Sequence, residues 1–264
     1  MMLQNQEATK PALECVGLTK RFTGLTAVDQ VDLRLDPGER RAIIGPNGAG
    51  KTTLFSLISG IHPVTSGSIR IYGQDITHLP SHRRTYLGLG RTFQITTLFP
   101  TLSMEENLII AAMGLKRVKL SMLKPLSSYR DLRDRASALL KAVGLSGKEE
   151  DIVKNLSHGE QRQVEICLAL ISDPKVLLMD EPTAGLSPAD SAHMTELIRK
   201  LDRNITILII EHDMDVAFKV ADTITVLNLG SIFAEGTPME IRNNEKVQEI
   251  YFGSERNTFS SEGE

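Results

Sequence analysis

The chain has 264 residues, 41% of them hydrophobic and 24% charged, which fits a globular protein with one large domain or two coupled lobes. Its 30 Lys and Arg against 33 Asp and Glu give a formal net charge of −3, so charge gives no case for a nucleic-acid partner. No apolar run approaches the roughly 18 residues that a membrane helix needs, and the start has no apolar signal-peptide core, so we expect neither a membrane-spanning nor a secreted protein.

The first stretch of the chain has the patterns of β-strands. Apolar and charged residues alternate over residues 31–36, which is the period of a half-buried strand, and a turn sequence follows at residues 36–39. Residues 41–44 predict a short strand that runs into a glycine-rich loop, and Ile69 and Ile71 mark another alternating strand.

The middle stretch, about residues 96–172, is predicted to be mostly helical. One helical face is formed by apolar residues that Gly144 would terminate: Leu132, Ala136, Leu139, Leu140 and Val143. A second helix after Ser157 has the i, i+3, i+4, i+7 spacing at Val164, Cys167, Leu168 and Ile171. The two cysteines, Cys15 and Cys167, have no zinc spacing and form no disulfide framework, so we expect buried thiols in a reducing cytosol.

The last stretch alternates strands with a helix. Residues 176–179 and 205–210 are continuous apolar runs, as expected of strands buried on both faces. Between them, Met194, Leu197, Ile198 and Leu201 predict the inward face of a helix. Strand–helix–strand alternation predicts a parallel sheet covered by helices. We expect flexible polar tails at residues 1–11 and 254–264.

A complete phosphate-loop motif follows the strand at residues 41–44. It fits G-x-x-x-x-G-K-[ST] and reads Gly45, Pro46, Asn47, Gly48, Ala49, Gly50, Lys51 and Thr52. Glycines let backbone N–H groups surround phosphate oxygens, and the N-terminus of the helix predicted from Thr52 to Ser59 adds partial positive charge. We expect Lys51 to reach the outer phosphates of ATP, the Thr52 hydroxyl to coordinate Mg²⁺, and Thr53 to contact the nucleotide. A plain glycine turn before a helix is the weaker alternative.

An acidic pair, Asp180 and Glu181, stands where the strand at 176–179 ends. The carboxyl ends of parallel strands face the ligand in open sheets, so both side chains are expected at the nucleotide. Asp180 suits the binding of Mg²⁺, and Glu181 suits the polarisation of the attacking water. The alternative, a solvated acidic turn, loses weight because the phosphate loop lies upstream.

The sequence from Leu156 to Gln161, Leu-Ser-His-Gly-Glu-Gln, resembles the signature motif of ATP-binding cassette (ABC) ATPases. The resemblance covers about residues 12–253 and implies an α/β fold: a P-loop NTPase (RecA-like) core with an antiparallel β subdomain and an inserted α-helical signature subdomain. The β and core parts would span about residues 12–95 and 173–253, and the helical subdomain about 96–172.

The resemblance also implies roles for single residues. Phe22 resembles the aromatic residue that stacks on adenine, and Gln94 the glutamine that senses metal and water and contacts the membrane partner. Ser157 and Gly159 resemble the donors that clamp the γ-phosphate of ATP bound to a second copy, and His212 the histidine at that phosphate. The implied assembly is a head-to-tail dimer that closes on two ATP molecules and opens after hydrolysis.

Three positions depart from the family pattern. His158 and Glu160 replace a glycine and a glutamine of the usual signature, and Ser187 stands where the loop after Glu181 usually has an aspartate. Simpler roles remain open, since Ser157 with Glu160 reads as a helix capping box and Ser187 as another helix cap. Phe22 also fits an ordinary core residue, because aromatic side chains are often buried.

Several further segments resemble one branch of the family, the first ATPase subunit of branched-chain (hydrophobic) amino-acid uptake systems in bacteria. They are residues 91–94, 98–100, 181–186, 210–214, 234–238 and the ending Tyr251-Phe252-Gly253. This resemblance implies two membrane permease subunits, a second ABC ATPase subunit and an extracytoplasmic solute-binding protein, with the chain at the cytoplasmic face of the inner membrane. Residues 94–107 would face the permease.

Two other functions stay open from the sequence. A soluble non-transport ABC ATPase would fit the absence of a membrane helix, although such proteins usually carry coiled-coil insertions or two cassettes. A nucleotide-binding switch without turnover is disfavoured by the intact Lys51, Asp180, Glu181 and His212. The solute itself is not encoded here, and urea, amides or aromatic acids are alternatives to hydrophobic amino acids.

Overall fold

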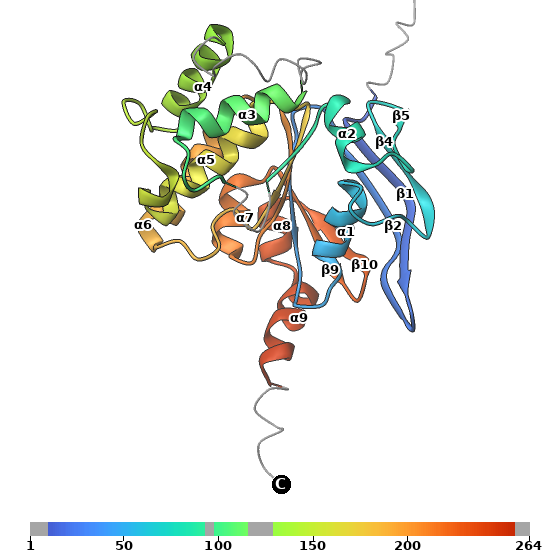
Figure 1. Cartoon of the computed structure of the whole chain (residues 1–264). Helices are drawn as coiled ribbons and strands as arrows, with labels where there is room; N and C mark the ends of the chain where they lie inside the picture. Colours follow the sequence, from blue (N-terminus) through green and yellow to red (C-terminus); the bar gives the residue numbers. More distant parts are fainter. Residues whose placement is uncertain (1–9, 93–97, 116–128, 257–264) are drawn as a thin grey trace, which may run out of the picture.

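The computed structural model describes residues 10–92, 98–115 and 129–256. Two sheets and the helices around them form the domain (Figure 1). The strands are β1 (Leu13–Phe22), β2 (Leu25–Leu35), β3 (Arg40–Ile44), β4 (Ser66–Ile71), β5 (Gln74–Asp75), β6 (Leu89–Arg91), β7 (Val176–Asp180), β8 (Thr206–Ile210), β9 (Thr223–Asn228) and β10 (Ser231–Gly236). The helices are α1 (Lys51–Ile58), α2 (Ser81–Tyr86), α3 (Met104–Leu115), α4 (Arg130–Ala142), α5 (His158–Leu170), α6 (Pro188–Lys200), α7 (Met214–Val220), α8 (Pro238–Arg242) and α9 (Glu245–Arg256).

The larger sheet has six strands in the order β10-β9-β3-β8-β7-β6, and all of its pairings are parallel except that of β10 with β9. The smaller sheet is antiparallel, in the order β2-β1-β4-β5. Side chains alternate between the two faces of β2, so that Val31, Leu33 and Leu35 are buried while Asp32 and Arg34 are exposed. The predicted α/β class with an antiparallel β portion is confirmed.

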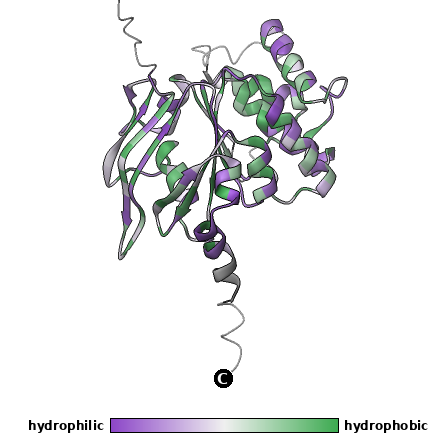
Figure 2. Cartoon of the chain, turned by 180° about the vertical axis from the view of Figure 1, so that it is seen from behind, coloured by the Kyte–Doolittle hydropathy of each residue, from purple (hydrophilic) through white to green (hydrophobic). Residues whose placement is uncertain are grey.

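Both faces of the six-stranded sheet are covered, which explains its continuous apolar strands. Along β7, Leu177 faces a core shared with α5, α6 and α7, whereas Leu178 faces a core shared with α1 and the smaller sheet. Figure 1 shows α1 between the two sheets and the other large helices on the opposite side. Figure 2 shows hydrophobic residues concentrated in the strands and on the inner sides of these helices.

Helices α3, α4 and α5 pack on one another beside the sheet (Figure 1). Their shared apolar cluster contains Ile109, Ala112, Leu132 and Ile171. The helix predicted around residues 132–143 is α4, which ends at Ala142; Gly144 follows its cap residue, and the φ of 88° there favours glycine. The helix predicted after Ser157 is α5, with Val164 and Cys167 fully buried. Both cysteines are buried free thiols, as expected.

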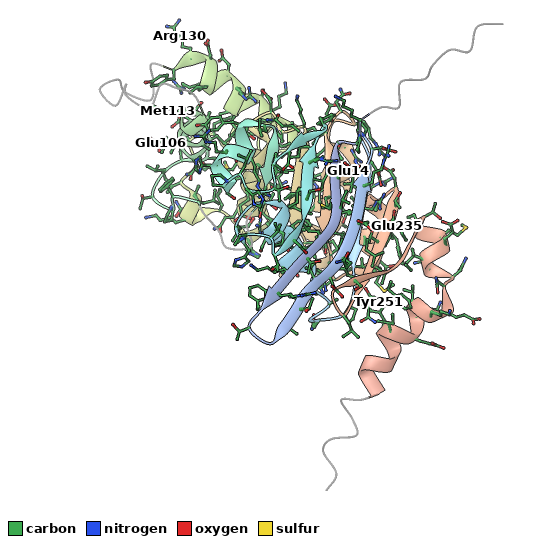
Figure 3. The ribbon with its side chains drawn as sticks, turned by 90° about the vertical axis from the view of Figure 1, so that its right-hand side faces the viewer. Glu14, Glu106, Met113, Arg130, Glu235 and Tyr251 are labelled. Atoms are coloured by element: carbon green, nitrogen blue, oxygen red, sulfur yellow. The ribbon has the colours of Figure 1, made fainter. Side chains whose placement is uncertain are left out.

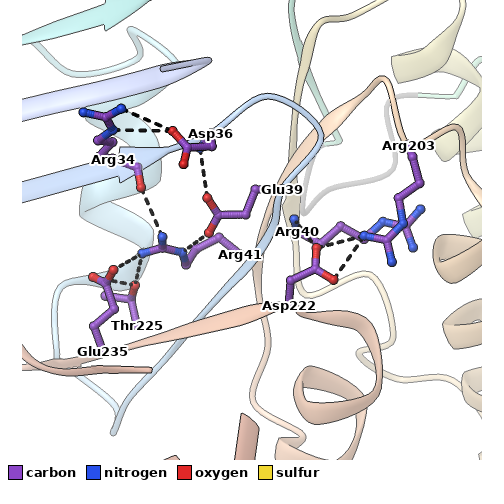
Figure 4. Close-up of polar contacts among 9 residues, drawn as sticks. All are labelled: Arg34, Asp36, Glu39, Arg40, Arg41, Arg203, Asp222, Thr225 and Glu235. Atoms are coloured by element: carbon purple, nitrogen blue, oxygen red, sulfur yellow. Dashed lines mark hydrogen bonds and ion pairs between the residues drawn. The ribbon is translucent and has the colours of Figure 1, made fainter. Parts of the chain in front are cut away.

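A polar cluster fixes the start of β3, the strand that leads into the phosphate loop (Figure 4). The buried Arg41 guanidinium pairs with Glu39 at 2.6 Å and with Glu235 of β10 at 2.5 Å. The Arg40 backbone N–H donates to the Asp222 carboxylate at 2.9 Å, just before β9 begins. These contacts join the central strand to its neighbours, so the loop that follows it starts from a fixed position.

The C-terminal helix α9 begins at a side-chain cap. The Asn244 side chain accepts the N–H groups of Lys246 and Val247 at the start of this helix, and Val247 is fully buried. A capped and anchored helix propagates at little further cost, and the helical backbone of α9 continues to Arg256. The flexible tail expected over residues 254–264 stays a prediction.

Candidate functional site

The carboxyl ends of three neighbouring strands meet at one edge of the larger sheet. Ile210, at the end of β8, pairs with Ile43 of β3 on one side and with Asp180 of β7 on the other. The residues that follow these strands therefore lie together, although they are far apart in the sequence. They are the phosphate loop, Glu181 and His212.

The phosphate loop has a backbone that only glycine permits. Gly45, Gly48 and Gly50 have φ angles of 151°, 79° and 100°. A Cβ atom on Gly45 would lie 2.2 Å from the Leu227 carbonyl oxygen, and one on Gly50 would lie 2.3 Å from that of Ala27. The loop is thus fixed by its neighbours, and any side chain at these two positions would push it away from them.

The Lys51 side chain lies folded over the loop. Its ammonium group donates to the carbonyl oxygens of Gly45 at 2.6 Å and Pro46 at 3.0 Å. Burial lowers the pKa of the Lys51 amine, and the carboxylates of Glu181 and Asp180 act in the opposite direction. A buried cation beside a glycine-rich loop at a helix N-terminus is placed to meet phosphate oxygens.

An open cavity of about 500 Å³ lies over the loop. It is lined by the expected contacts from Asn47 to Thr53, by His212, by the β1–β2 hairpin and by the β9–β10 turn: Asn47, Gly48, Ala49, Gly50, Lys51, Thr52, Thr53, His212, Leu25, Thr26, Ala27, Leu229 and Gly230. Its floor is the N-terminus of α1, where the helix dipole favours negative charge. The shape and polarity suit a polyphosphate.

Asp180 is fully buried at the end of β7. One of its carboxylate oxygens, Oδ2, lies 3.3 Å from the Arg91 guanidinium, whereas Oδ1 has no hydrogen-bond partner in the described part of the chain. Burial raises the pKa of the Asp180 carboxyl, and Arg91 works against this shift. Mg²⁺ prefers oxygen ligands. Asp180 Oδ1 and the hydroxyl of the exposed Thr52 are oxygens of this kind, so these two residues fit the ion.

Glu181 and His212 face each other directly. The His212 Nε2 atom lies 2.6 Å from Glu181 Oε1. Glu181 itself has a φ of 47°, a left-handed conformation that costs a non-glycine residue about 1–3 kcal/mol. A strained residue persists only where its surroundings hold it, so the turn after β7 fixes the orientation of the Glu181 carboxylate.

Arg162 of α5 holds that turn from behind. Its guanidinium donates to the carbonyl oxygens of Glu181 at 2.6 Å and Pro182 at 3.1 Å, and it pairs with Glu165 at 2.7 Å. The signature helix is thereby tied to the backbone beside the acidic pair. The sequence analysis missed this role, because a single arginine about one turn into a helix has no distinctive pattern.

A second buried carboxylate supports the same region. Glu211 accepts hydrogen bonds from the Thr183 hydroxyl at 3.0 Å and from the Thr183 N–H at 3.3 Å. Burial raises the pKa of Glu211 to about 7. It therefore joins the segment after Glu181 to the segment that carries His212. The sequence analysis gave Glu211 no role, and the only indication of one was its position directly before His212.

The signature residues occupy a separate surface at the start of α5. Ser157 caps this helix by accepting the Glu160 N–H at 3.2 Å, and Glu160 returns a carboxylate to the Ser157 N–H at 2.9 Å, so the predicted capping box is confirmed. Gly159 packs against Asp190, and a Cβ on it would lie 3.2 Å from the Asp190 Cγ. Neither Ser157 nor Gly159 is among the described residues that line the cavity over the phosphate loop.

The structure also places the remaining sequence candidates. Phe22 is 43% exposed at the end of β1, with its ring edge-on to His62 at 5.9 Å, so it is not a core residue. Ser187 is a helix cap, with its hydroxyl accepting the Asp190 N–H at 3.2 Å. Gln94 lies outside the described residues.

Two features are absent from the described ranges of the chain. No cluster of three or more His, Cys, Asp and Glu residues is arranged to hold a metal ion. No helix there has the length and apolar character needed to cross a membrane. A Mg²⁺ ion bound through a hydroxyl, one carboxylate and phosphate oxygens would not need such a cluster.

Comparison with known proteins adds an independent result. Residues 28–184 match the family model described as ABC transporter, and residues 231–257 match the model described as branched-chain amino acid ATP-binding cassette transporter. The chain is 40% identical, over 93% of its length and 99% of the relative, to the high-affinity branched-chain amino acid transport ATP-binding protein LivG of Escherichia coli (strain K12). It is 38% identical to the corresponding protein BraF of Pseudomonas aeruginosa, again over 93% and 99%.

Solved structures agree with these matches. The crystal structure of the ADP conformation of an ATP-binding cassette of an ABC transporter superposes with a TM-score of 0.83 at 32% identity, covering 92% of this chain and 99% of that one. A nucleotide-free cassette from an ABC transporter gives a TM-score of 0.81 at 30% identity, covering 91% and 98%.

Proposed function

This chain belongs to the ATP-binding cassette family of ABC transporters, and from that premise we propose that it drives the uptake of hydrophobic amino acids as one ATPase subunit of an importer. The observation that carries the solute class is the match of residues 231–257 to the branched-chain amino acid model, since this segment lies outside the shared ATPase motifs. The names of relatives such as LivG and BraF point to the same class.

The phosphate loop would hold the ATP. Lys51 exchanges its two loop carbonyls for the outer phosphates, and N–H groups from Asn47 to Thr53 bind their oxygens. The Thr52 hydroxyl and the Asp180 carboxylate would bind Mg²⁺, with Gln94 as the residue that senses metal and water. When bound, the ion neutralises charge that develops on the β- and γ-phosphates.

Hydrolysis would use the pair of Glu181 and His212. The Glu181 carboxylate accepts a hydrogen bond from the attacking water and orients its oxygen toward the γ-phosphorus. The new P–O bond forms as the bond to the leaving ADP breaks. The His212 ring, 2.6 Å from Glu181, is placed to hold this carboxylate and to contact the γ-phosphate.

A second cassette would complete the site. Ser157 and Gly159 are not among the described residues that line the cavity over this chain's own phosphate loop, and Ser157 is exposed. We therefore assign them to the ATP on a partner ATPase, which is either an identical copy or a related subunit. Phe22 is exposed and therefore free to stack on adenine. In this arrangement ATP joins two chains, and its hydrolysis lets them separate.

Membrane permeases would be the other partners. We place the chain at the cytoplasmic face of the inner membrane, bound to two permease subunits that receive solute from an extracytoplasmic binding protein. The contact would be made by residues 94–107, of which Phe99 is 52% exposed. A Phe99→Asp change should then weaken assembly while leaving ATP binding intact. Unchanged assembly and uptake would count against this surface.

The test of the function is a pull-down from solubilised membranes with tagged Glu181→Gln protein and ATP, followed by mass spectrometry. This change should trap the closed ATP state, whereas a Lys51→Ala control should not reach it. Recovery of two multi-span membrane proteins and a second cassette supports the importer, and the associated binding protein is then screened with leucine, urea, amides and aromatic acids. Recovery of ribosomal or DNA-associated proteins instead would sink the transport proposal and leave only the ATPase.

A further inference from the structure

The signature surface at the start of α5 carries a negative charge of its own. Glu160 lies in the first turn of this helix and accepts the Ser157 N–H at 2.9 Å through its Oε2 atom. It stands where the usual signature has a neutral glutamine. The N-terminus of a helix carries partial positive charge that favours an anion, and a carboxylate in the first turn offsets that charge. An unpaired Glu160 would therefore oppose the phosphate that we assign to Ser157.

Lys148 brings a positive charge to the same place. Its ammonium group donates to Glu160 Oε1, the carboxylate oxygen that the helix cap does not use. This hydrogen bond raises the pKa of the Lys148 amine and lowers the pKa of the Glu160 carboxyl. Both groups are therefore charged at neutral pH, and they form an ion pair next to Ser157.

The loop that carries Lys148 joins α4 to α5 and is held by backbone hydrogen bonds. The Lys148 carbonyl oxygen accepts the Asp151 N–H at 2.9 Å, and the Asp151 carbonyl oxygen accepts the Met104 N–H at 3.1 Å, where α3 begins. Figure 3 shows this helical part of the domain, in which Glu106 of α3 and Arg130 of α4 are labelled, to one side of the sheets. Lys148 thus extends toward α5 from a backbone position that α3 fixes.

We propose that Lys148 is a positioning residue for the signature surface: it neutralises Glu160, so that the start of α5 can accept the phosphate of ATP bound to a partner cassette. The role is electrostatic, because the Lys148 side chain is 49% exposed and an exposed ion pair contributes little to folding. The inference rests on the proposed role of Ser157 and adds the loop before α5 to the surface that meets the partner.

Two single charge changes separate this role from a structural one. Lys148→Met leaves Glu160 unpaired, so the KM for ATP in the assembled complex should rise about three- to tenfold, the effect of one partly screened charge near a phosphate. Glu160→Gln removes the anion and keeps the capping box, which glutamine also completes, so its KM should equal that of wild type or fall below it. The double variant should return to the wild-type value. A pair that served only to stabilise the helix would give equal losses in both single variants.

Arg199→Met is the matched control. Arg199 pairs with Glu196 at 2.7 Å on α6, and both side chains are about half exposed, so this change also breaks an exposed ion pair. Its KM should equal that of wild type. The isolated Lys148→Met chain should bind a fluorescent ATP analogue with the wild-type Kd, because Lys148 is not among the described residues that line the cavity over the phosphate loop.

The experiment measures phosphate release against ATP concentration in the assembled complex, for wild type and each variant, at about 50 mM and about 500 mM salt. The rise in KM for Lys148→Met should be largest at low salt, because salt screens Glu160 from the phosphates. A wild-type KM in Lys148→Met at low salt, or equal rises in Lys148→Met and Glu160→Gln, overturns the inference. If Ser157→Ala lowers turnover while Lys148→Met has no effect, only this inference fails. If neither change has an effect, the proposed role of the signature surface fails as well.

Discussion

The two halves of the proposed nucleotide site, the loop half around Lys51 and the signature half at the start of α5, differ in how many of their contacts this chain itself provides. In the loop half, Lys51 and Asp180 are buried, and His212 is already paired with Glu181. In the signature half, Ser157 lies exposed at the start of α5, with its hydroxyl used to cap its own helix. The described groups of the loop half are assembled within a single chain, whereas in the signature half Ser157 is exposed and Gly159 is buried beside Asp190.

Under the proposed function, this difference predicts that the chain binds ATP alone and needs a partner for turnover. Groups that are fixed before the ligand arrives lose little entropy when it binds, so the loop half is ready to receive phosphate. The signature half would gain a ligand only when a second molecule brings one. Substitutions in the loop half should therefore alter ATP hydrolysis or the stability of this chain. Substitutions in the signature half should alter the hydrolysis of ATP that a partner chain binds.

The largest effect should follow from Glu181→Gln, which keeps the size of the side chain and removes its charge. We expect kcat for ATP to fall about a thousandfold, because the water loses the carboxylate that orients it. The Kd for ATP should stay near that of wild type, since the loop and Lys51 are untouched. Phosphate release and analogue binding, measured in the assembled complex, provide the two values.

Glu196→Gln serves as the control for this change, because Glu196 lies on the outer side of α6, paired with Arg199 in solvent. Its turnover should equal that of wild type. A Glu181→Gln complex that still hydrolyses ATP at the wild-type rate would remove Glu181 from the chemistry and make the loop half a binding site only.

The next effect concerns stability and comes from Glu211, the buried carboxylate behind the loop half. Burial raises its pKa to about 7 from an ordinary value of 4.5, so the folded chain holds this proton more tightly than the unfolded chain. The stabilisation is complete below about pH 4.5 and is lost as the pH rises through about 7. The total is at most about 3 kcal/mol.

Glu211→Gln mimics the protonated side chain at every pH and can still accept the Thr183 N–H and hydroxyl. Relative to wild type, this variant should become progressively more stable between pH 4.5 and 8, as measured by urea unfolding. The exposed Glu196→Gln variant should track wild type across the same series. A constant difference between Glu211→Gln and wild type would mean that Glu211 does not titrate in this window.

The strand, glycine loop and helix of the loop half could be predicted from the sequence because they depend on residues that are adjacent in the chain. Gly45 to Thr52 needs adjacent glycines, a lysine and a hydroxyl, and Asp180 must follow a buried strand. These requirements leave short motifs at recognisable positions. The strands β3, β7 and β8 and the helices α4 and α5 were predicted for the same reason, since apolar periodicity records which face is buried.

What the sequence did not predict are contacts between distant segments. Arg162 donates to backbone carbonyl oxygens about 20 residues further along the chain. Every residue has a backbone carbonyl, so no sequence motif can mark the ones that accept such a bond. The roles assigned to Phe22 and Gln94 came from family resemblance alone and remain predictions.

The smallest effect we predict tests the signature half directly, through Ser157→Ala. Loss of the cap should cost about 1 kcal/mol of stability, and loss of the hydroxyl should lower turnover about tenfold. Thr237 provides a matched control, since it forms the same capping box with Glu240 at α8, outside the signature. Thr237→Ala should cost similar stability with no loss of turnover, as measured by chemical unfolding and phosphate release in the complex. Equal turnover losses in both variants would reduce Ser157 to a helix cap and leave the second half of the site without its donor. A loss confined to Ser157→Ala would mean that its hydroxyl both caps α5 and serves the ATP held by the neighbouring chain.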